Sequence, residues 1–248
     1  MASNPPGECC FKAVLHEGEP TGEETKIFGY NSYVAGASNP KDKVIVILTD
    51  IYGYGFKNTQ LIADQLAKRT GYYVVVPDIL KGEALVFGKV TPEIFGDWFS
   101  RHPIQGTKDI VTDFLTNLKK ELNPDYLCGI GYCFGAKYLF HQMTADGLFD
   151  VGVGAHPSFA DDDEVSAIRK PVLISAAEKD NIFTAELRHK TESILSSIEG
   201  LRYQIDLFGG VEHGFTIRSD ENIPAVRYAK NKALIDHVYW FKEFEPTK

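Results

Sequence analysis

The segment with the clearest chemistry is a cysteine between two glycines, at the junction of an expected strand and an expected helix. Gly131-Tyr-Cys133-Phe-Gly135 follows the apolar run 126–130, and a helical pattern comes directly after it. Turns of the form Gly-x-nucleophile-x-Gly expose a nucleophile, usually serine, and their glycines let strand and helix pass close together. A helix N-terminus also favours the thiolate form of cysteine. An isolated cysteine would be structural, but this setting predicts that Cys133 is a nucleophile.

A thiol nucleophile needs a base and an acid that orients the base, and both residue types follow later strands. Asp180 follows the strand expected at 172–176, and His213 follows the strand expected at 203–207. Because active residues gather beyond the carboxyl ends of such strands, we expect these side chains to meet Cys133. His213 would accept the thiol proton, and Asp180 would fix its tautomer and stabilise the imidazolium. Glu178 is the alternative acid, and Asp180 is favoured because it lies farther out on the loop.

The loop 49–55, after the strand expected at 44–48, offers groups that could stabilise an oxyanion. In elbows of this kind the N–H after the nucleophile, here Phe134, acts with one from this loop, for which Ile51 is the candidate. Asp50 lies at the tip of the strand, where a carboxylate could repel or hold the thiol before substrate arrives. A turn or N-cap aspartate is an equally good interpretation of Asp50.

The elements that must position these residues alternate between strand and helix. Such alternation predicts one α/β domain over residues 1–248, with a mostly parallel central sheet and helices on both faces. A segment without a clear pattern, expected as a loop, covers about 80–105, and residues 1–23 are expected to be loosely ordered. Strands are expected at 44–48, 72–76, 126–130, 151–155, 172–176 and 203–207 after a hairpin within 24–34, and helices near 61–70, 110–122, 136–143, 184–197 and 224–244.

Composition excludes several classes of function. The 248 residues are 44% hydrophobic, with a formal net charge of −8 and no cluster of basic residues. That charge argues against binding to nucleic acid or to an anionic membrane. The sequence shows neither a secretory signal pattern nor an apolar run that could span a bilayer. Adjacent Cys9 and Cys10 do not match a zinc-ligand spacing, Cys128 lies mid-strand, and a reactive thiol suits the reducing cytoplasm.

Several motifs taken together resemble the dienelactone hydrolase family, a cysteine branch of the α/β-hydrolases, over about residues 27–244. The resemblance, closest to the fungal cytosolic members, implies a three-layer α/β-hydrolase fold. It also implies a Cys133–Asp180–His213 triad that hydrolyses a lactone or enol ester through a thioester, without metal or organic cofactor. The motifs are Thr49-Asp-Ile-Tyr-Gly53, Val76-Pro-Asp-Ile79, Gly131-Tyr-Cys-Phe-Gly135, Ser175-Ala-Ala-Glu-Lys-Asp180 and His213-Gly-Phe215.

The resemblance also implies residues that bind substrate. In the bacterial enzymes a glutamate restrains the resting thiol, and Asp50 fills that position with a shorter reach. Those enzymes hold a substrate carboxylate with two arginines. Arg218 could serve as one, whereas the other position lacks an arginine and Lys81 is the nearest cation, which argues against the carboxylated dienelactone itself. His156, at another strand end, is either a pocket residue or a capping or core histidine.

Three functions remain open at this point. A thiol hydrolase acting on small activated esters or lactones uses every residue named above. A redox or electrophile sensor that keeps the fold would need a reactive Cys133 alone. Acyl transfer to an acceptor other than water shares all of the hydrolase residues. The expected partner is a small ester or lactone, not nucleic acid or membrane, and the expected state is a monomer or weak dimer.

Overall fold

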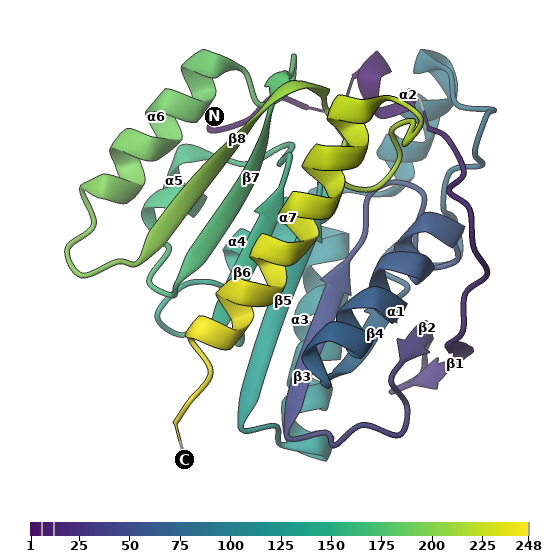
Figure 1. Ribbon diagram of the computed structural model, residues 1–248, viewed down its shortest axis with the longest axis vertical. Coiled ribbons are helices and arrows are strands. Elements are labelled where there is room, and N and C mark those ends of the chain that lie inside the picture. Colours follow the sequence, from purple (N-terminus) through teal and green to yellow (C-terminus); the bar gives the residue numbers. More distant parts are fainter. Residues whose placement is uncertain (6, 12, 248) are drawn as a thin grey trace.

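The computed structural model describes residues 1–5, 7–11 and 13–247, and within these ranges eight strands form one sheet (Figure 1). Their spatial order is β1-β2-β4-β3-β5-β6-β7-β8. The first two pairs, β1 with β2 and β2 with β4, are antiparallel, and all later pairs are parallel. The strands are β1 (Glu23–Ile27), β2 (Tyr30–Ala35), β3 (Lys43–Leu48), β4 (Tyr73–Pro77), β5 (Tyr126–Tyr132), β6 (Val151–Ala155), β7 (Val172–Lys179) and β8 (Tyr203–Glu212).

Helices cover both faces of this sheet, so the predicted three-layer α/β architecture is confirmed. Figure 1 shows α1 (Lys57–Thr70) and α7 (Pro224–Glu243) side by side on one face. The other face carries α3 (Ile104–Leu122), α4 (Phe134–His141) and α6 (Ala185–Ser196). The short α5 (Asp162–Ser166) contacts both α4 and α6.

The strand β3 illustrates why the central strands read as continuous apolar runs. Val44, Val46 and Leu48 belong to the core under α3 and α4, whereas Ile45 and Ile47 belong to the core under α1 and α7. All five side chains are fully buried. Because successive side chains of a strand point to opposite faces, a strand covered on both sides needs apolar residues at every position. Each such burial contributes about 1.5–3 kcal/mol.

The parallel register brings the ends of four strands to one edge of the sheet. Leu48 of β3 pairs with Gly131 of β5, Tyr132 with Ala155 of β6, and Ala155 with Ser175 of β7. Residues that follow these positions therefore share the carboxyl edge, which lies at the top of Figure 1. This edge is where the sequence predicts the chemistry.

The expectation of a loop over 80–105 is wrong in part, because α2 (Pro92–Arg101) lies within it. The Thr91 side chain caps this helix by accepting a hydrogen bond from the N–H of Ile94, and Pro92 occupies its first turn. Both are helix-start signals that the sequence carries. Trp98 is the buried residue of α2. Ile94, Phe95, Trp98 and Phe99 also recur at helical spacing, and Phe95 and Phe99 pack partly buried against the core, so the sequence carries an apolar periodicity that the loop expectation overlooked.

The N-terminal residues run across the carboxyl edge of the sheet. The N–H groups of Ala2 and Ser3 donate to the Ala160 carbonyl oxygen, at 2.8 and 2.9 Å. Farther along, the N–H of Val14 donates to the carbonyl oxygen of Arg218 at 2.7 Å. Between them lies the one-turn helix η1 (Glu8–Phe11). Loose order of residues 1–23 in solution stays a prediction, which hydrogen exchange would test.

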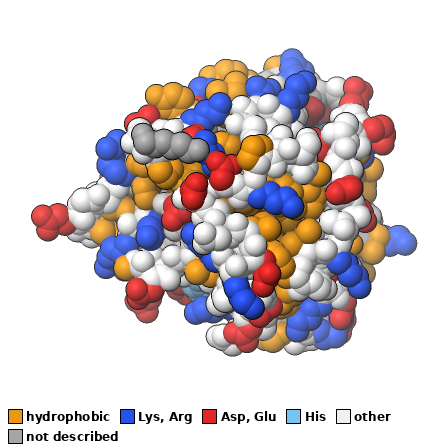
Figure 2. All heavy atoms as spheres, turned by 90° about the horizontal axis from the view of Figure 1, so that it is seen from below, with side chains coloured by type: hydrophobic (Ala, Val, Ile, Leu, Met, Phe, Trp, Pro, Cys, Tyr) orange, Lys and Arg blue, Asp and Glu red, His pale blue; other side chains and the backbone are white. Residues whose placement is uncertain are grey.

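The surface carries charges of both signs. Figure 2, which views the molecule from below Figure 1, shows acidic and basic side chains interspersed over that end of the molecule. Such a mixture creates no extended basic field of the kind that attracts nucleic acid. Among the described residues, no helix combines the length and the apolar character needed to cross a membrane.

Candidate active site

Cys133 lies between β5 and α4 in a strained backbone conformation, with φ 50° and ψ −106°. Its N–H donates to the carbonyl oxygen of Ala155 at 3.0 Å, and its carbonyl oxygen accepts from the N–H of Ser158 at 3.1 Å. A non-glycine residue in such a region costs about 1–3 kcal/mol and persists only where its surroundings fix it. The hydrogen bonds to β6 and to the segment after it hold the sharp turn that the sequence predicts.

Close backbone contacts explain the two glycines of the elbow. A Cβ atom on Gly131 would lie 2.5 Å from Cα of Ala136, and one on Gly135 would lie 2.1 Å from the carbonyl oxygen of Leu48. Neither neighbour can rotate away, because both contacts are with backbone. The start of α4 can therefore pack against β3 and β5 only where these side chains are absent.

The structure brings Cys133, His213 and Asp180 together. Nε2 of His213 lies 3.2 Å from Sγ of Cys133, and Nδ1 lies 2.8 Å from Oδ2 of Asp180. All three side chains are buried. With Nδ1–H donating to the carboxylate, Nε2 is the nitrogen that faces the sulfur and can exchange a proton with it.

The geometry also separates the two candidate acids. Oδ1 of Asp180 accepts hydrogen bonds from the N–H groups of Ile182 and Phe183, at 2.7 and 2.9 Å, which leaves Oδ2 directed at His213. Glu178 is exposed, and its carboxylate accepts from the N–H of Gly210 at 2.7 Å. Asp180 is thus the carboxylate placed to orient the imidazole. Glu178 instead connects strand β7 to strand β8 through its hydrogen bond with Gly210.

Electrostatics at the site favour a thiolate–imidazolium pair. Burial raises the pKa of the Cys133 thiol, but a hydrogen bond from Cys10 and the charge of His213 outweigh burial and hold that pKa well below 9.0. Burial lowers the pKa of His213, whereas the negative charges of Cys133 and Asp180 together raise it to about 10. The proton therefore resides on the imidazole at neutral pH.

His156 lies behind the triad. Its ring centroid is 5.0 Å from that of His213, and its Nε2 lies 2.7 Å from Oγ1 of Thr216. Burial lowers the pKa of His156 to about 4, so this ring is neutral at physiological pH. This neutral, fully buried ring packs against the imidazole of His213, and its hydrogen bond to Cys133 helps to lower the pKa of the thiol.

Asp50 forms an ion pair that the sequence does not reveal. Its Oδ2 accepts from Nη1 of Arg218 at 2.6 Å, and its Oδ1 accepts from the N–H of Tyr52 at 3.0 Å. Both Asp50 and Arg218 are buried. Burial raises the pKa of Asp50, and the Arg218 guanidinium offsets only part of that effect. The carboxylate thus anchors the arginine and also closes the turn after β3.

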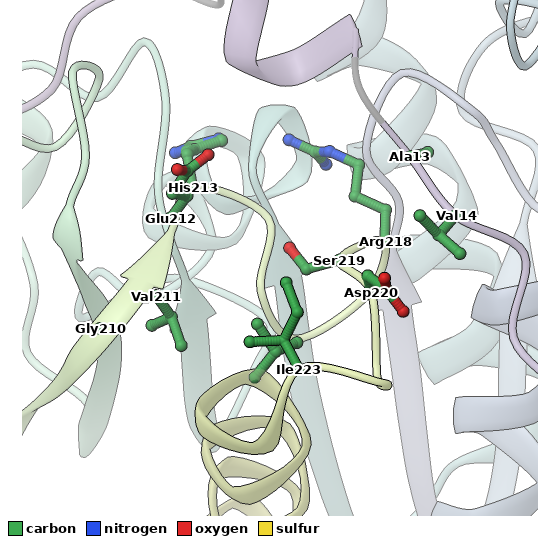
Figure 3. Close-up of a pocket in the computed structure, with 11 residues that line it drawn as sticks. Ala13, Val14, Gly210, Val211, Glu212, His213, Arg218, Ser219, Asp220 and Ile223 are labelled. Carbon is green, nitrogen blue, oxygen red and sulfur yellow. The ribbon is translucent and has the colours of Figure 1, made fainter.

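Arg218 extends along one side of a cleft of about 230 Å³. Figure 3 shows its guanidinium directed toward His213. Gly214 allows this path, because a Cβ atom there would lie 2.6 Å from Cζ of the arginine. Within the described part of the chain, Nε and Nη2 of Arg218 have no hydrogen-bond partner. Two buried donors next to the triad are therefore available to an anionic or carbonyl oxygen.

The remaining predicted residues divide into two groups. Ile51 and Phe134 follow the paired strands β3 and β5, each three residues beyond the Leu48–Gly131 pair, so both lie at the carboxyl edge. Their role as oxyanion donors stays a prediction. Lys81 is exposed, with φ 56°, in the turn after β4.

Sequence reasoning missed the contact of the N-terminal segment with the nucleophile. Sγ of Cys10 lies 3.7 Å from Sγ of Cys133, and both residues are fully buried. Oγ of Ser158 lies 3.6 Å from the same sulfur. Cys10 therefore lies directly against the elbow, and Cys133 has no exposed surface. The Cys9 side chain lies outside what the structure describes.

The sheet order and the elbow after β5 define an α/β-hydrolase fold. Solved structures with this fold include a putative dienelactone hydrolase from Klebsiella pneumoniae, with a TM-score of 0.72 and 17% identity over 90% of this chain and 98% of that one. The model of the dienelactone hydrolase family matches residues 30–245, and the chain belongs to that family. Membership supports a hydrolase that acts on lactone or ester substrates.

Curated relatives extend over the same length. Hydrolase tropI of Talaromyces stipitatus is 40% identical over the whole of both chains, and hydrolase pyvD of Aspergillus violaceofuscus is 40% identical over 98% of this chain and 99% of its own. The human carboxymethylenebutenolidase homolog is 25% identical over 90% of this chain and 91% of its own. Each match covers nine tenths or more of both chains rather than a shared fragment.

Proposed function

We propose that this protein hydrolyses small esters or lactones through a thioester on Cys133. The observation that carries the proposal is the chain of contacts from Asp180 through His213 to the Cys133 sulfur, with separations of 2.8 and 3.2 Å. This is the arrangement that nucleophilic acyl transfer requires, in which a base touches the nucleophile and an acid orients the base. The family description and the relatives named as hydrolases support the same chemistry.

Cys133 is fully buried against Cys10, so this contact must open before substrate enters. In the first half-reaction the Cys133 thiolate then attacks the carbonyl carbon of the substrate. The N–H groups of Ile51 and Phe134 stabilise the oxyanion that forms. The imidazolium of His213 then donates its Nε2 proton to the departing alkoxide or enolate oxygen, and the carbon–oxygen bond breaks. For a lactone the leaving group stays tethered to the acyl chain. A thioester on Cys133 and a neutral His213 result.

In the second half-reaction neutral His213 accepts a proton from water as the water attacks the thioester carbonyl. Breakdown of this adduct releases the carboxylic acid and regenerates the thiolate beside an imidazolium. Asp180 holds the ring tautomer through both steps. A thiolate suits substrates with good leaving groups, such as enol esters and strained lactones, better than it suits peptides.

Arg218 supports a preference for substrates that carry an anionic group near the reacting carbonyl. Its buried Nε and Nη2 groups have no partner among the described residues, and the cleft in Figure 3 lies directly below them. Asp50 holds the guanidinium in place at 2.6 Å. Since Lys81 is exposed in the turn after β4, we assign the anion-binding role to Arg218 alone.

The proposal is tested by profiling wild type and Cys133→Ala against a library of small esters and lactones. We expect hydrolysis by wild type, a product burst with good leaving groups, and an acylated Cys133 peptide in mass spectra of rapidly quenched reactions. Cys128→Ala is the matched control, because it removes a buried thiol from the opposite core. Undiminished hydrolysis by Cys133→Ala would refute the thioester mechanism.

A further inference from the structure

Three metal-ligating atoms converge at the carboxyl edge of the sheet: Sγ of Cys10, Sγ of Cys133 and Nε2 of His213. The two sulfurs lie 3.7 Å apart, and the imidazole nitrogen lies 3.2 Å from the Cys133 sulfur. All three atoms lie within 4.8 Å of one another, and all three residues are buried. Cys133 and His213 belong to the proposed catalytic mechanism, and Cys10 contributes a hydrogen bond that lowers the pKa of the Cys133 thiol.

From this juxtaposition we propose that Cys10, Cys133 and His213 form a binding site for Zn²⁺. Tetrahedral zinc has Zn–S bonds of about 2.3 Å and Zn–N bonds of about 2.0–2.1 Å, which set two sulfurs about 3.8 Å apart and a sulfur and a nitrogen about 3.6 Å apart. The observed separation of the sulfurs, 3.7 Å, matches. Nε2 of His213 lies 3.2 Å from the Cys133 sulfur, slightly closer than in a zinc site, and within 4.8 Å of the Cys10 sulfur. Two cysteines and one histidine leave a fourth position for water.

The surroundings of His213 already suit a metal ligand. Zinc-bound histidines generally donate their second ring N–H to a carboxylate, which fixes the tautomer and directs the other nitrogen at the metal. Nδ1 of His213 lies 2.8 Å from Asp180, which is in turn held by two backbone N–H groups. The geometry that orients a catalytic base therefore also orients a zinc ligand.

Charge balance favours a soft divalent cation over other ions. Binding releases the Nε2 proton of His213 and the thiol proton of Cys10 to solvent. The two thiolates then neutralise the charge of Zn²⁺, which avoids the cost of burying an uncompensated cation, and Asp180 keeps its charge and its hydrogen bond to His213. The nearby Arg218 is already paired with Asp50, so it adds little net positive charge. Sulfur ligands discriminate against Mg²⁺ and Ca²⁺, which prefer oxygen.

Zinc in this site would switch the enzyme off reversibly. The ion occupies the sulfur lone pair that attacks substrate and the nitrogen that carries the proton, so neither half-reaction can start. This consequence rests on the proposed hydrolase function, whereas binding of the metal does not. Removal of zinc by a chelator restores the direct contact between the Cys133 thiolate and the His213 imidazole.

The test replaces Zn²⁺ by Co²⁺, because sulfur-to-cobalt charge-transfer absorption reports thiolate ligands directly. Reduced wild-type protein should show this band at one Co²⁺ per chain, and Zn²⁺ should displace it. Cys10→Ala should lose about half of the band, because one of the two thiolate ligands is gone. Its affinity for Zn²⁺ should fall by more than roughly 10–100-fold, which is the loss that removal of an outer-shell partner causes. Cys128→Ala removes a thiol buried in the other core and should behave as wild type.

A wild-type titration without the charge-transfer band overturns the proposal, and so does an undiminished band in Cys10→Ala. Cys10→Ser, checked by circular dichroism, replaces Cys10→Ala if the latter does not fold. A separate assay measures ester hydrolysis with zinc and with chelator, each variant relative to its own metal-free rate. If the charge-transfer band appears but the metal-free protein hydrolyses no ester, the proposed function is refuted and the metal site is supported.

Discussion

Sγ of Cys133 lies 3.2 Å from Nε2 of His213, although the two residues are 80 positions apart in the sequence. Folding thus places a thiol and an imidazole, each near neutral on its own at physiological pH, where a proton passes from one to the other. The negative charges of Cys133 and Asp180 raise the pKa of His213 to about 10, and the hydrogen bond from Cys10 and the charge of His213 lower the pKa of the thiol. The resting site is an ion pair.

Ionisation of Cys133 should therefore persist far below the ordinary pKa of a thiol. The Cys133 thiolate is measured as the difference in ultraviolet absorbance between wild type and Cys133→Ser. This difference should stay constant as the pH falls from 9 to neutral, because the pKa of the Cys133 thiol in the folded protein lies well below 9.0. In His213→Gln the charge and hydrogen bond of the imidazole no longer lower the pKa of the thiol, so the same difference should fall at a higher pH than in wild type. Equal titration curves for the two proteins would disprove the ion pair.

Asp180 provides a second prediction, because its two oxygens have separate tasks. In Asp180→Asn the amide oxygen can still accept from Ile182 and Phe183, but the NH₂ group then faces Nδ1 of His213. The ring must adopt the other tautomer, with a proton on Nε2, and cannot accept one. We expect kcat/KM for an activated ester to fall by about 10³–10⁴-fold while the fold is kept.

The control for this change is Glu178→Gln, the neighbouring acid whose carboxylate accepts a hydrogen bond from Gly210. Its activity should stay near that of wild type. A larger loss in Glu178→Gln than in Asp180→Asn would reassign the orienting acid. Circular dichroism and thermal melts of both variants separate this outcome from loss of folding.

The sheet, the elbow and the proximity of Cys133, Asp180 and His213 could be predicted because local patterns report them. Apolar runs mark strands buried on both faces, and the glycines around Cys133 record close backbone contacts. In parallel sheets, order along the chain fixes the edge at which strand ends meet, which is why Asp180 and His213 could be placed near the nucleophile.

Contacts that depend on the path of irregular segments could not be predicted in this way. Arg218 and Asp50 are 168 positions apart, and Cys10 and Cys133 are 123 apart, with no repeating pattern to connect them. The helix α2 is a different case, because Ile94, Phe95, Trp98 and Phe99 recur at helical spacing and the sequence did carry the signal. Its N-terminal signals, Thr91 and Pro92, indicate the same helix.

The elbow glycines yield a stability prediction. In Gly135→Ala the new methyl group meets the backbone oxygen of Leu48 at 2.1 Å, and no rotamer change relieves the contact. We expect a loss of about 3 kcal/mol or more in the free energy of unfolding. That loss corresponds to a drop in melting temperature of roughly 6–12 °C.

The control is Gly96→Ala, at an exposed position of α2 with open space around it. This variant should instead gain up to about 1 kcal/mol in the free energy of unfolding. Similar melting temperatures for the two variants would contradict this packing.

Arg218 sets the last prediction, which concerns the choice of substrate. Replacing the arginine alone would strand the buried Asp50 charge and cost about 3–5 kcal/mol of stability. The double variant Asp50→Asn/Arg218→Gln removes both charges and keeps polar groups that can hydrogen-bond to each other. For this variant we expect kcat/KM for an ester that carries a free carboxylate to fall by roughly 10–100-fold relative to the same substrate with that carboxylate methylated. This is the value of a charge-assisted hydrogen bond of about 1.5–3 kcal/mol.

The control is Lys81→Gln, which should leave this ratio unchanged, because Lys81 is exposed in the turn after β4. An unchanged ratio in the double variant would remove Arg218 from substrate recognition and leave it the structural partner of Asp50.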